Sequence, residues 1–261
     1  MKGWLVLATL SACMHSRRDH VGPITAITLV GQRTFSCSQA GVGEQTPTGM
    51  RWFADPGVRA FALAGLAGDE GAWLLVGGGA PAQSGELVLL TGAGGVLARR
   101  QVAEDLVYAV AVTSPSLAAA ACADGRVLTL ALPHLDEQRT RWRHGGPAVA
   151  VAFSPDGSLL ASAGHDGKVL FGCPVGDMPP QALLDHTAAV TCLAWSADGR
   201  HLASGARDGK VRLHDRSGHL LHTWQRLGGA LTSVSFRTGE LECLVASRPG
   251  VSARLAVLVL P

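Results

Sequence analysis

The chain has 261 residues, 47% of them hydrophobic, and its 22 basic residues almost balance 20 acidic ones, for a net charge of +2. Because the sequence has no long run of basic residues, a nucleic-acid partner is not expected. The 33 glycines and 13 prolines indicate a chain with many tight turns.

The N-terminus has the pattern of a secretory signal: a positive start, an apolar run at 4–10, and small residues before Cys13. The stretch Leu10-Ser11-Ala12-Cys13 resembles the lipobox of bacterial lipoproteins. That resemblance implies that residues 1–12 are a cleaved signal peptide, that Cys13 carries a lipid anchor, and that residues 13–19 form a tether. The apolar run itself is far too short to span a bilayer.

Residues 20–101 are interpreted as two irregular units, 20–55 and 56–101, whose strands lie between glycine-rich turns. In the first unit the expected strands are His20–Ile27, Phe35–Ser38 and a degenerate third strand at Arg51–Phe53. In the second unit they are Val58–Leu63, Trp73–Val76 and Glu86–Leu90.

Three stretches farther along the chain share one register and follow one another at a constant spacing. They begin at Asp124-Gly125, Asp166-Gly167 and Asp208-Gly209, and His144 and His186 are separated by the same interval. A fixed period of about 40 residues indicates an array of one supersecondary unit.

The clearest unit covers residues 186–227, where short apolar stretches alternate with tight turns. Asp198-Gly199 and Asp208-Gly209 supply the positive-φ positions that hairpin turns need. The expected strands are Val190–Trp195, His201–Gly205, Val211–His214 and Leu220–Trp224. Four short antiparallel strands of this kind make one propeller blade. Strands of a last unit are expected at 231–236, 243–247 and 254–260.

This unit resembles the WD-repeat family of β-propellers in His186, the Ser-x-Asp-Gly turn at 196–199, the strand Leu202–Gly205, and Asp208-Gly209. The resemblance implies an all-β fold, a single β-propeller of four-stranded antiparallel blades over residues 20–261. The six expected blades are 20–55, 56–101, 102–143, 144–185, 186–227 and 228–261, and seven blades are the alternative.

In the resembled family a His, a strand Ser, a turn Asp and a Trp form a hydrogen-bonded cluster inside each blade. The residues that the resemblance assigns to such structural clusters are His186, Ser204 and Asp208, then His144, Ser162 and Asp166, and finally Asp124 alone. His214 and Gly172 stand at two of the Trp positions. Ser, His and Asp are also the three residue types of a catalytic triad. Because the same set occurs in two neighbouring units, a structural role is favoured.

The same family suggests a second interpretation of the N-terminus, since its propellers usually close with an N-terminal segment in the last blade. When His20 is aligned with His186, residues 2–7 and 12–18 fall at the third and fourth strand positions. The last unit has three expected strands, and an open strand edge invites mispairing. In this interpretation residues 1–12 are an uncleaved closing strand, and the protein is a cytoplasmic scaffold.

The six cysteines include no C-x-x-C pair, so no metal site is expected. Four of them fall within expected strands, where cysteine behaves as a small buried hydrophobe, with a disulfide as the alternative. These four are Cys37, Cys122, Cys192 and Cys243.

The sequence contains no catalytic or cofactor-binding motif, so neither an enzyme nor a cofactor is expected. The expected function is a monomeric, non-catalytic platform for protein partners, anchored to the bacterial envelope membrane through Cys13. The outer membrane is favoured because Met14 stands where Asp marks inner-membrane retention in the lipoprotein family. The candidate partner contacts are His165, Arg207, Trp142, Arg143 and Trp224, since Trp and Arg are typical of interface hot spots. For Trp142 and Trp224 the alternative is packing within a blade. The alternatives are the cytoplasmic scaffold and an enzyme or ligand-binding propeller that uses the central channel.

Overall fold

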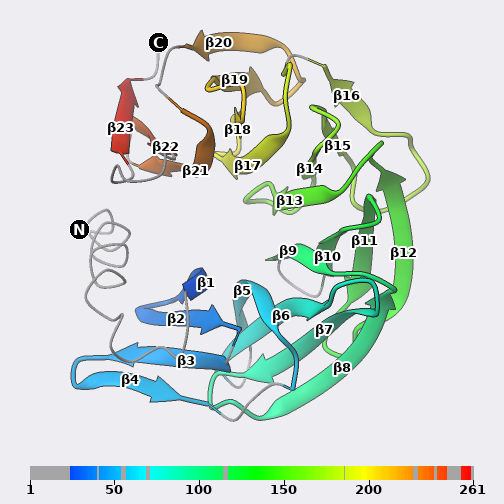
Figure 1. The fold of residues 1–261 in the computed structure, drawn as a ribbon, viewed down its shortest axis with the longest axis vertical. Coiled ribbons are helices and arrows are strands. Elements are labelled where there is room, and N and C mark those ends of the chain that lie inside the picture. Colours follow the sequence, from blue (N-terminus) through cyan, green and yellow to red (C-terminus); the bar gives the residue numbers. More distant parts are fainter. Residues whose placement is uncertain are drawn as a thin grey trace. The chain divides into compact units, whose positions relative to one another are not determined.

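The computed structural model describes residues 24–39, 41–53, 57–68, 71–113, 117–184, 186–225, 229–237, 240–245 and 254–259. Every helix or strand in these ranges is a β-strand, and they therefore hold no helix that could cross a membrane. The strands form six antiparallel sheets, five of four strands and one of three (Figure 1). The expected all-β class and the six units are confirmed.

Within each sheet, strands that follow one another in the chain are neighbours. The first sheet holds β1 (Ile24–Val30), β2 (Arg33–Ser38), β3 (Gly41–Thr46) and β4 (Gly49–Trp52), and the second holds β5 (Ala60–Gly68), β6 (Gly71–Ala80), β7 (Ser84–Thr91) and β8 (Val96–Ala103). The third sheet holds β9 (Val107–Thr113), β10 (Leu117–Cys122), β11 (Arg126–Ala131) and β12 (Asp136–Arg143).

The remaining sheets contain the regular repeats. The fourth holds β13 (Ala148–Phe153), β14 (Leu160–Gly164), β15 (Val169–Gly172) and β16 (Gln181–Leu183), and the fifth holds β17 (Val190–Trp195), β18 (His201–Ala206), β19 (Val211–Asp215) and β20 (Leu220–Trp224). The sixth holds β21 (Leu231–Arg237), β22 (Glu240–Val245) and β23 (Arg254–Val259). The fifth sheet reproduces its four predicted strands almost residue for residue.

One prediction in the first sheet is wrong. Arg51 and Trp52 belong to the fourth strand, not to a degenerate third one, because the third strand is Gly41–Thr46. That segment, Gly-Val-Gly-Glu-Gln-Thr, has a single apolar residue and two glycines, so its composition gives no strand signal. The strand β8 is likewise absent from the prediction, since its arginines and glutamine interrupt the apolar pattern.

The chain divides into two compact structural units, each larger than one repeat, which are called the first unit and the second unit. The first comprises residues 1–124 with 129–139, and the second comprises residues 125–128 with 140–261. In the first unit, buried side chains such as Phe35, Leu74 and Leu90 form one apolar core cluster. In the second unit, one cluster gathers around Phe171 and Leu202, and another around Leu213 and Leu231. The second strands of the fourth and fifth sheets, β14 and β18, are buried along almost their whole length, in agreement with their small and apolar side chains.

The cysteines within the described ranges are free thiols, and Cys37, Cys122 and Cys192 are buried as expected. Burial raises the pKa of the Cys37 thiol to about 11, so the thiol stays protonated at neutral pH. Cys173 is exposed. Cys13 and the whole segment 1–23 lie outside the described residues, and so does the side chain of Cys243.

Candidate functional site

The fourth sheet brings together three residues that the sequence places far apart. His144, just before β13, contacts Asp166 Oδ1 through Nδ1 at 3.0 Å and Ser162 Oγ through Nε2 at 2.9 Å. The backbone N–H of Gly145 donates to Asp166 Oδ2 at 2.9 Å. The Asp carboxylate therefore holds both the His ring and the loop that enters the blade.

The fifth sheet repeats the same geometry. His186 contacts Asp208 Oδ2 through Nδ1 at 3.1 Å and Ser204 Oγ through Nε2 at 2.9 Å. The backbone N–H of Thr187 donates to Asp208 Oδ2 at 3.3 Å. Asp208 also accepts from the backbone N–H of Lys210 at 3.0 Å, which fixes its own turn.

Trp142 supplies the indole that the sequence lacks at position 172. Its Nε1–H donates to Ser162 Oγ at 2.7 Å, and the side chain is buried. A Cβ on Gly172 would lie at an ordinary contact distance of 3.9 Å from the Trp142 ring, so the indole from β12 lies beside the position where the family has its Trp. Trp142 therefore belongs to the blade packing, the alternative that the sequence leaves open for it, because the residue completes the cluster of the fourth sheet.

Arg212 is a member of the second cluster that the sequence analysis does not identify. Its side chain is only 6% exposed, and its Nη1 donates to Asp208 Oδ2 at 3.1 Å and lies against His186 Nδ1. It is paired across the sheet with Ser204, on β18. The equivalent position of the preceding repeat is Leu170. This change from an apolar to a charged residue is the signal in the sequence that could have indicated an additional cluster member.

The electrostatics of both clusters favour a neutral imidazole beside a charged carboxylate. Burial, reinforced by the Arg212 charge, lowers the pKa of His186 to about 4. Burial also lowers the pKa of His144, against the attraction of Asp166. Burial alone would raise the pKa of Asp208, but hydrogen bonds from Arg212 and His186 outweigh it and hold that pKa below its usual range.

The Ser, His and Asp groups have the connectivity of a catalytic triad, yet both serines are fully buried. Ser162 and Ser204 are each 0% exposed, so no substrate carbonyl can reach either Oγ in this structure. A nucleophile must lie within reach of the reacting atom. The two clusters therefore act as hydrogen-bonded supports within their sheets.

The turns at the other end of these sheets are also fixed by side chains. Ser196 Oγ donates to Asp198 at 2.6 Å, and Ser154 Oγ donates to Asp156 at the same distance. Arg216 then links the two sheets, since it donates to Asp156 at 2.6 Å and to the Gly199 carbonyl at 3.1 Å. Hydrogen bonds from Ser154 and Arg216 hold the pKa of Asp156 well below its usual range.

Three of the predicted contact residues are exposed. His165 and Arg207 precede the Asp-Gly turns, where their backbone N–H groups donate to Pro147 and Ala189 at 2.9 Å. Arg143 ends β12 and is exposed as well. These residues therefore reach solvent from rigid backbone positions.

Trp224, another predicted contact, and Asp124, a predicted cluster residue, have different environments. Trp224 is half-buried against the core around Leu213 and lies over His222, with ring centroids 4.5 Å apart. It therefore acts at least in part as blade packing. Asp124 is exposed on its turn, and Ala120 stands at the strand position that serine holds in the two clusters, so the third sheet does not repeat their geometry.

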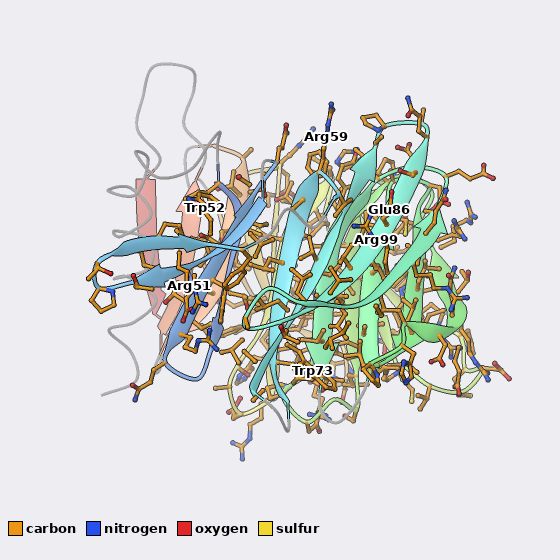
Figure 2. All side chains as sticks on the ribbon, turned by 90° about the horizontal axis from the view of Figure 1, so that it is seen from below. Arg51, Trp52, Arg59, Trp73, Glu86 and Arg99 are labelled. Atoms are coloured by element: carbon orange, nitrogen blue, oxygen red, sulfur yellow. The ribbon has the colours of Figure 1, made fainter. Side chains whose placement is uncertain are left out.

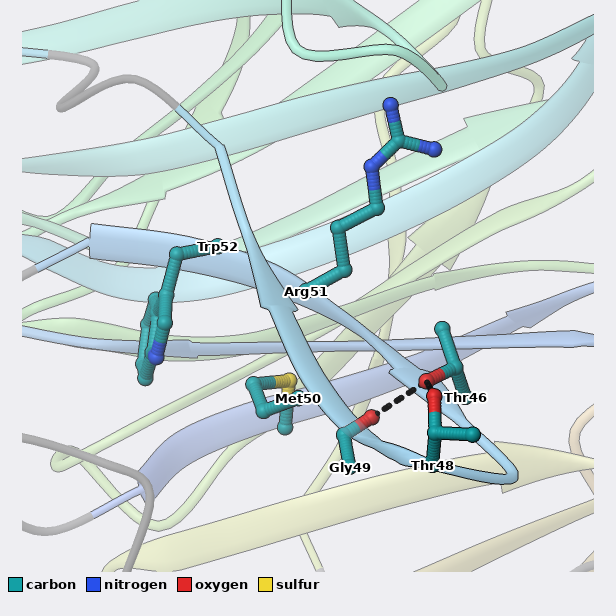
Figure 3. A pocket seen from close by; sticks show the side chains of 6 residues that line it. All are labelled: Thr46, Thr48, Gly49, Met50, Arg51 and Trp52. Carbon is teal, nitrogen blue, oxygen red and sulfur yellow. Dashed lines mark hydrogen bonds between the residues drawn. The ribbon is translucent and has the colours of Figure 1, made fainter.

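The first unit contains a hollow of about 590 Å³ on the β3–β4 hairpin. It is lined by Thr46, Thr48, Gly49, Met50, Arg51 and Trp52 (Figure 3). The sequence predicts neither the hollow nor its residues, because it gives no signal for the strand β3 that forms half of this hairpin. Among the described residues, no group of three His, Cys, Asp or Glu side chains could hold a metal ion.

Comparisons with known proteins agree with this geometry. The family model for the WD domain, G-beta repeat, matches residues 137–171 and 178–215, which contain both clusters. No curated protein sequence matches the chain. A propeller chain from the crystal structure of the mitotic checkpoint complex aligns with 90% of this chain and 80% of its own length, with a TM-score of 0.69 and 16% identity. At that identity, the likeness shows the fold alone.

Proposed function

We propose that this chain, which contains WD repeats and has the fold of a β-propeller, is a non-catalytic, monomeric platform that binds a protein partner. The fold supports this proposal, since propellers present many loops on rigid blades. Binding residues are disproportionately found on loops that a rigid scaffold positions. The structural neighbour was itself crystallised within a complex.

The observation that carries the proposal is a surface in the second unit, which we name the cationic face. It consists of Lys168, Arg207 and Lys210, with the exposed His165 beside them, and all four side chains are exposed or half-buried. The residues lie on two turns. The first turn bonds to the loop at Pro147 and the second to the loop at Ala189.

The carboxylates of the same turns do not neutralise this face. Asp166 turns inward to His144, and Asp208 turns inward to His186 and Arg212. Their side chains are 11% and 5% exposed. The cations thus remain outside while the anions are used inside, so the face is complementary to an acidic protein surface.

The test is a charge reversal with a matched control on the same strand. Arg207 follows β18 and Arg200 precedes it, so the two arginines lie at opposite ends of one strand. Partners crosslinked in the native host are quantified for the wild type, for Lys168→Glu with Arg207→Glu, and for Arg200→Glu. We expect the double variant to recover about tenfold less partner, since like charges across an interface repel. Equal recovery with all three proteins would contradict the proposed face.

We also propose that Cys13 anchors the protein in a bacterial envelope membrane, with the outer membrane favoured. The support is the lipobox-like stretch at 10–13 and the residue after Cys13, which is Met14. A cytoplasmic scaffold with an intact N-terminus is the alternative.

A further inference from the structure

We propose that the outer edge of the β3–β4 hairpin docks an extended protein segment in which an acidic residue stands between two apolar residues. The edge consists of Thr46, Thr48 and the strand Gly49–Trp52, which line the hollow described above. This site lies in the first unit and is independent of the cationic face.

The backbone of β4 is placed to pair with an added strand. The sheet runs in the order β1-β2-β3-β4, so β4 is its edge in the part of the chain that the structure describes. Phe53 N–H donates to the Val42 carbonyl at 3.0 Å. In an antiparallel pair such bonds alternate, so Arg51 also faces β3 while the N–H and C=O of Met50 point to the outer edge.

The positive charge of Arg51 on the hairpin is not fully neutralised by Glu44, the carboxylate of the same hairpin. Glu44 is directly opposite Arg51, but Arg33 binds both of its oxygens, at 2.6 and 2.9 Å. The hydrogen bond from Arg33 lowers the pKa of Glu44, and the charges of Arg33 and Arg51 add to this effect, so one ionised carboxylate is shared between two cations. The guanidinium of Arg51 is exposed and makes no hydrogen bond to any described residue.

Two larger side chains lie on the other face of the same strand. Trp52 is 38% exposed, and its ring lies 3.9 Å from where a Cβ of Gly41 would be. A Cβ on Gly43 would lie 2.9 Å from the sulfur of Met50, so this glycine makes room for Met50, while the ring of Trp52 packs beside Gly41. Figures 2 and 3 show Arg51 and Trp52 leaving β4 in different directions.

These three features define the occupant. A strand added to a sheet edge gains main-chain hydrogen bonds, and its alternate side chains meet alternate side chains of the edge. The residue opposite Arg51 would be acidic by charge complementarity. Its two neighbours would be apolar, because they lie against Met50 and Trp52.

The experiment measures fluorescence anisotropy with a labelled synthetic octapeptide of alternating valine and aspartate, and with its valine–lysine counterpart. We expect the aspartate peptide to bind the full chain, and Arg51→Glu or Trp52→Ala to weaken it about tenfold or more. Arg59→Glu is the matched control, since Arg59 is an exposed arginine of the same unit away from the hairpin (Figure 2). It should bind like the wild type, and each variant is first shown to keep the wild-type melting temperature.

A third peptide separates strand pairing from simple charge attraction. N-methylation of alternate amides removes the hydrogen bonds that an added strand needs but keeps the side chains. We expect this peptide to lose binding. The proposal is overturned if the aspartate peptide does not bind, if the N-methylated or lysine peptide binds equally well, or if Arg59→Glu weakens binding as much as Arg51→Glu.

Discussion

At the scale of single residues, the two buried clusters differ in one member, and that difference has an energetic consequence. Asp208 is paired with His186 and with the buried Arg212, whereas Asp166 is paired with His144, and Leu170 stands where the arginine would be. Removing one partner of a buried ion pair leaves an uncompensated charge. Removing a hydrogen-bond acceptor alone is less damaging.

We therefore expect Asp208→Ala to lower the free energy of unfolding by about 3–5 kcal/mol. Asp166→Ala, the matched change in the neighbouring sheet, should lower it by about 1–3 kcal/mol. Urea titrations of both variants measure the difference. Equal losses would show that Arg212 gains nothing from Asp208, and an unchanged midpoint with a lost activity would refute the structural role.

The lowered pKa of His186 makes stability depend on pH. Burial and the Arg212 charge bring this pKa to about 4, below the 6.5 of an unfolded histidine. The unfolded chain therefore binds more protons in this window, and the stabilisation present above pH 6.5 is lost as pH falls toward 4. Asp208 does not oppose this trend. Its pKa is lowered as well, so its contribution to stability is lost only at pH values below the usual pKa of an aspartate, and also on acidification.

Acidification from pH 7.5 to 5 should thus lower the free energy of unfolding by about 2 kcal/mol through His186. His144, whose pKa is also lowered, adds to the loss in the same direction. Thermal melts at the two pH values test this for the wild type and His186→Gln. The variant should be less stable at pH 7.5 and less sensitive to acid; a wild type that is equally stable at both values would refute the argument.

The sequence predicted the His, Ser and Asp positions of these clusters but not their complete membership. Trp142 could not be placed, because it belongs to β12 and reaches Ser162 only through the packing of one sheet on the next. Arg212 has no strand pattern that marks it as buried, since a charged side chain in a strand usually faces solvent. Both depend on tertiary contacts that no local pattern records.

At the scale of elements, the turns decided how well strands could be predicted. The first three strands of the fifth sheet are separated by Asp-Gly turns and match the prediction. The strand β3 follows no such turn and is rich in glycine, so the sequence gives no sign of it. Its glycines become understandable only once Trp52 and Met50 are seen to lie against them.

The Asp-Gly turns also pack on the loop of the following sheet, and this packing is testable. Gly125 has a φ of 86°, and an added Cβ would lie 2.7 Å from the His144 carbonyl and 2.8 Å from that of Gly146. Gly209 has a φ of 72°, but its nearest neighbour, the Gly229 carbonyl, is 3.2 Å away. Both positions disfavour alanine by about 1–2 kcal/mol through backbone conformation alone.

We expect Gly125→Ala to be more destabilising than Gly209→Ala, because its added Cβ would meet two carbonyl oxygens below 3.0 Å, whereas the nearest carbonyl oxygen to Gly209 is 3.2 Å away. Denaturant unfolding of the two variants gives the comparison. If Gly209→Ala lowers the free energy of unfolding more than Gly125→Ala does, the close approach of the Gly125 turn to the His144 loop is not what makes glycine necessary at position 125.

At the scale of the whole molecule, the repeat predicted the fold class and the six units, although the family model matches only two repeats. The other sheets keep the strand pattern without the complete set of cluster residues. Apolar strands and tight turns therefore suffice to specify a blade, and the clusters add local stability. What the molecule binds and where it resides depend on surface residues and the N-terminus, which the repeat does not constrain.

The N-terminus leads to the last prediction. If the lipobox resemblance is correct, the mature chain begins at Cys13 and carries acyl chains. A single acyl chain binds membranes only marginally, whereas several anchor stably, so washing with high salt should not release the protein. The measurement is the intact mass after expression in a bacterium that processes lipoproteins, with Cys13→Ala as the control that stays uncleaved. If residues 2–12 serve as a closing strand instead, the unmodified chain retains them, and deleting residues 2–13 lowers the melting temperature. An unmodified wild-type mass would therefore remove both the anchor and the envelope location that follows from it.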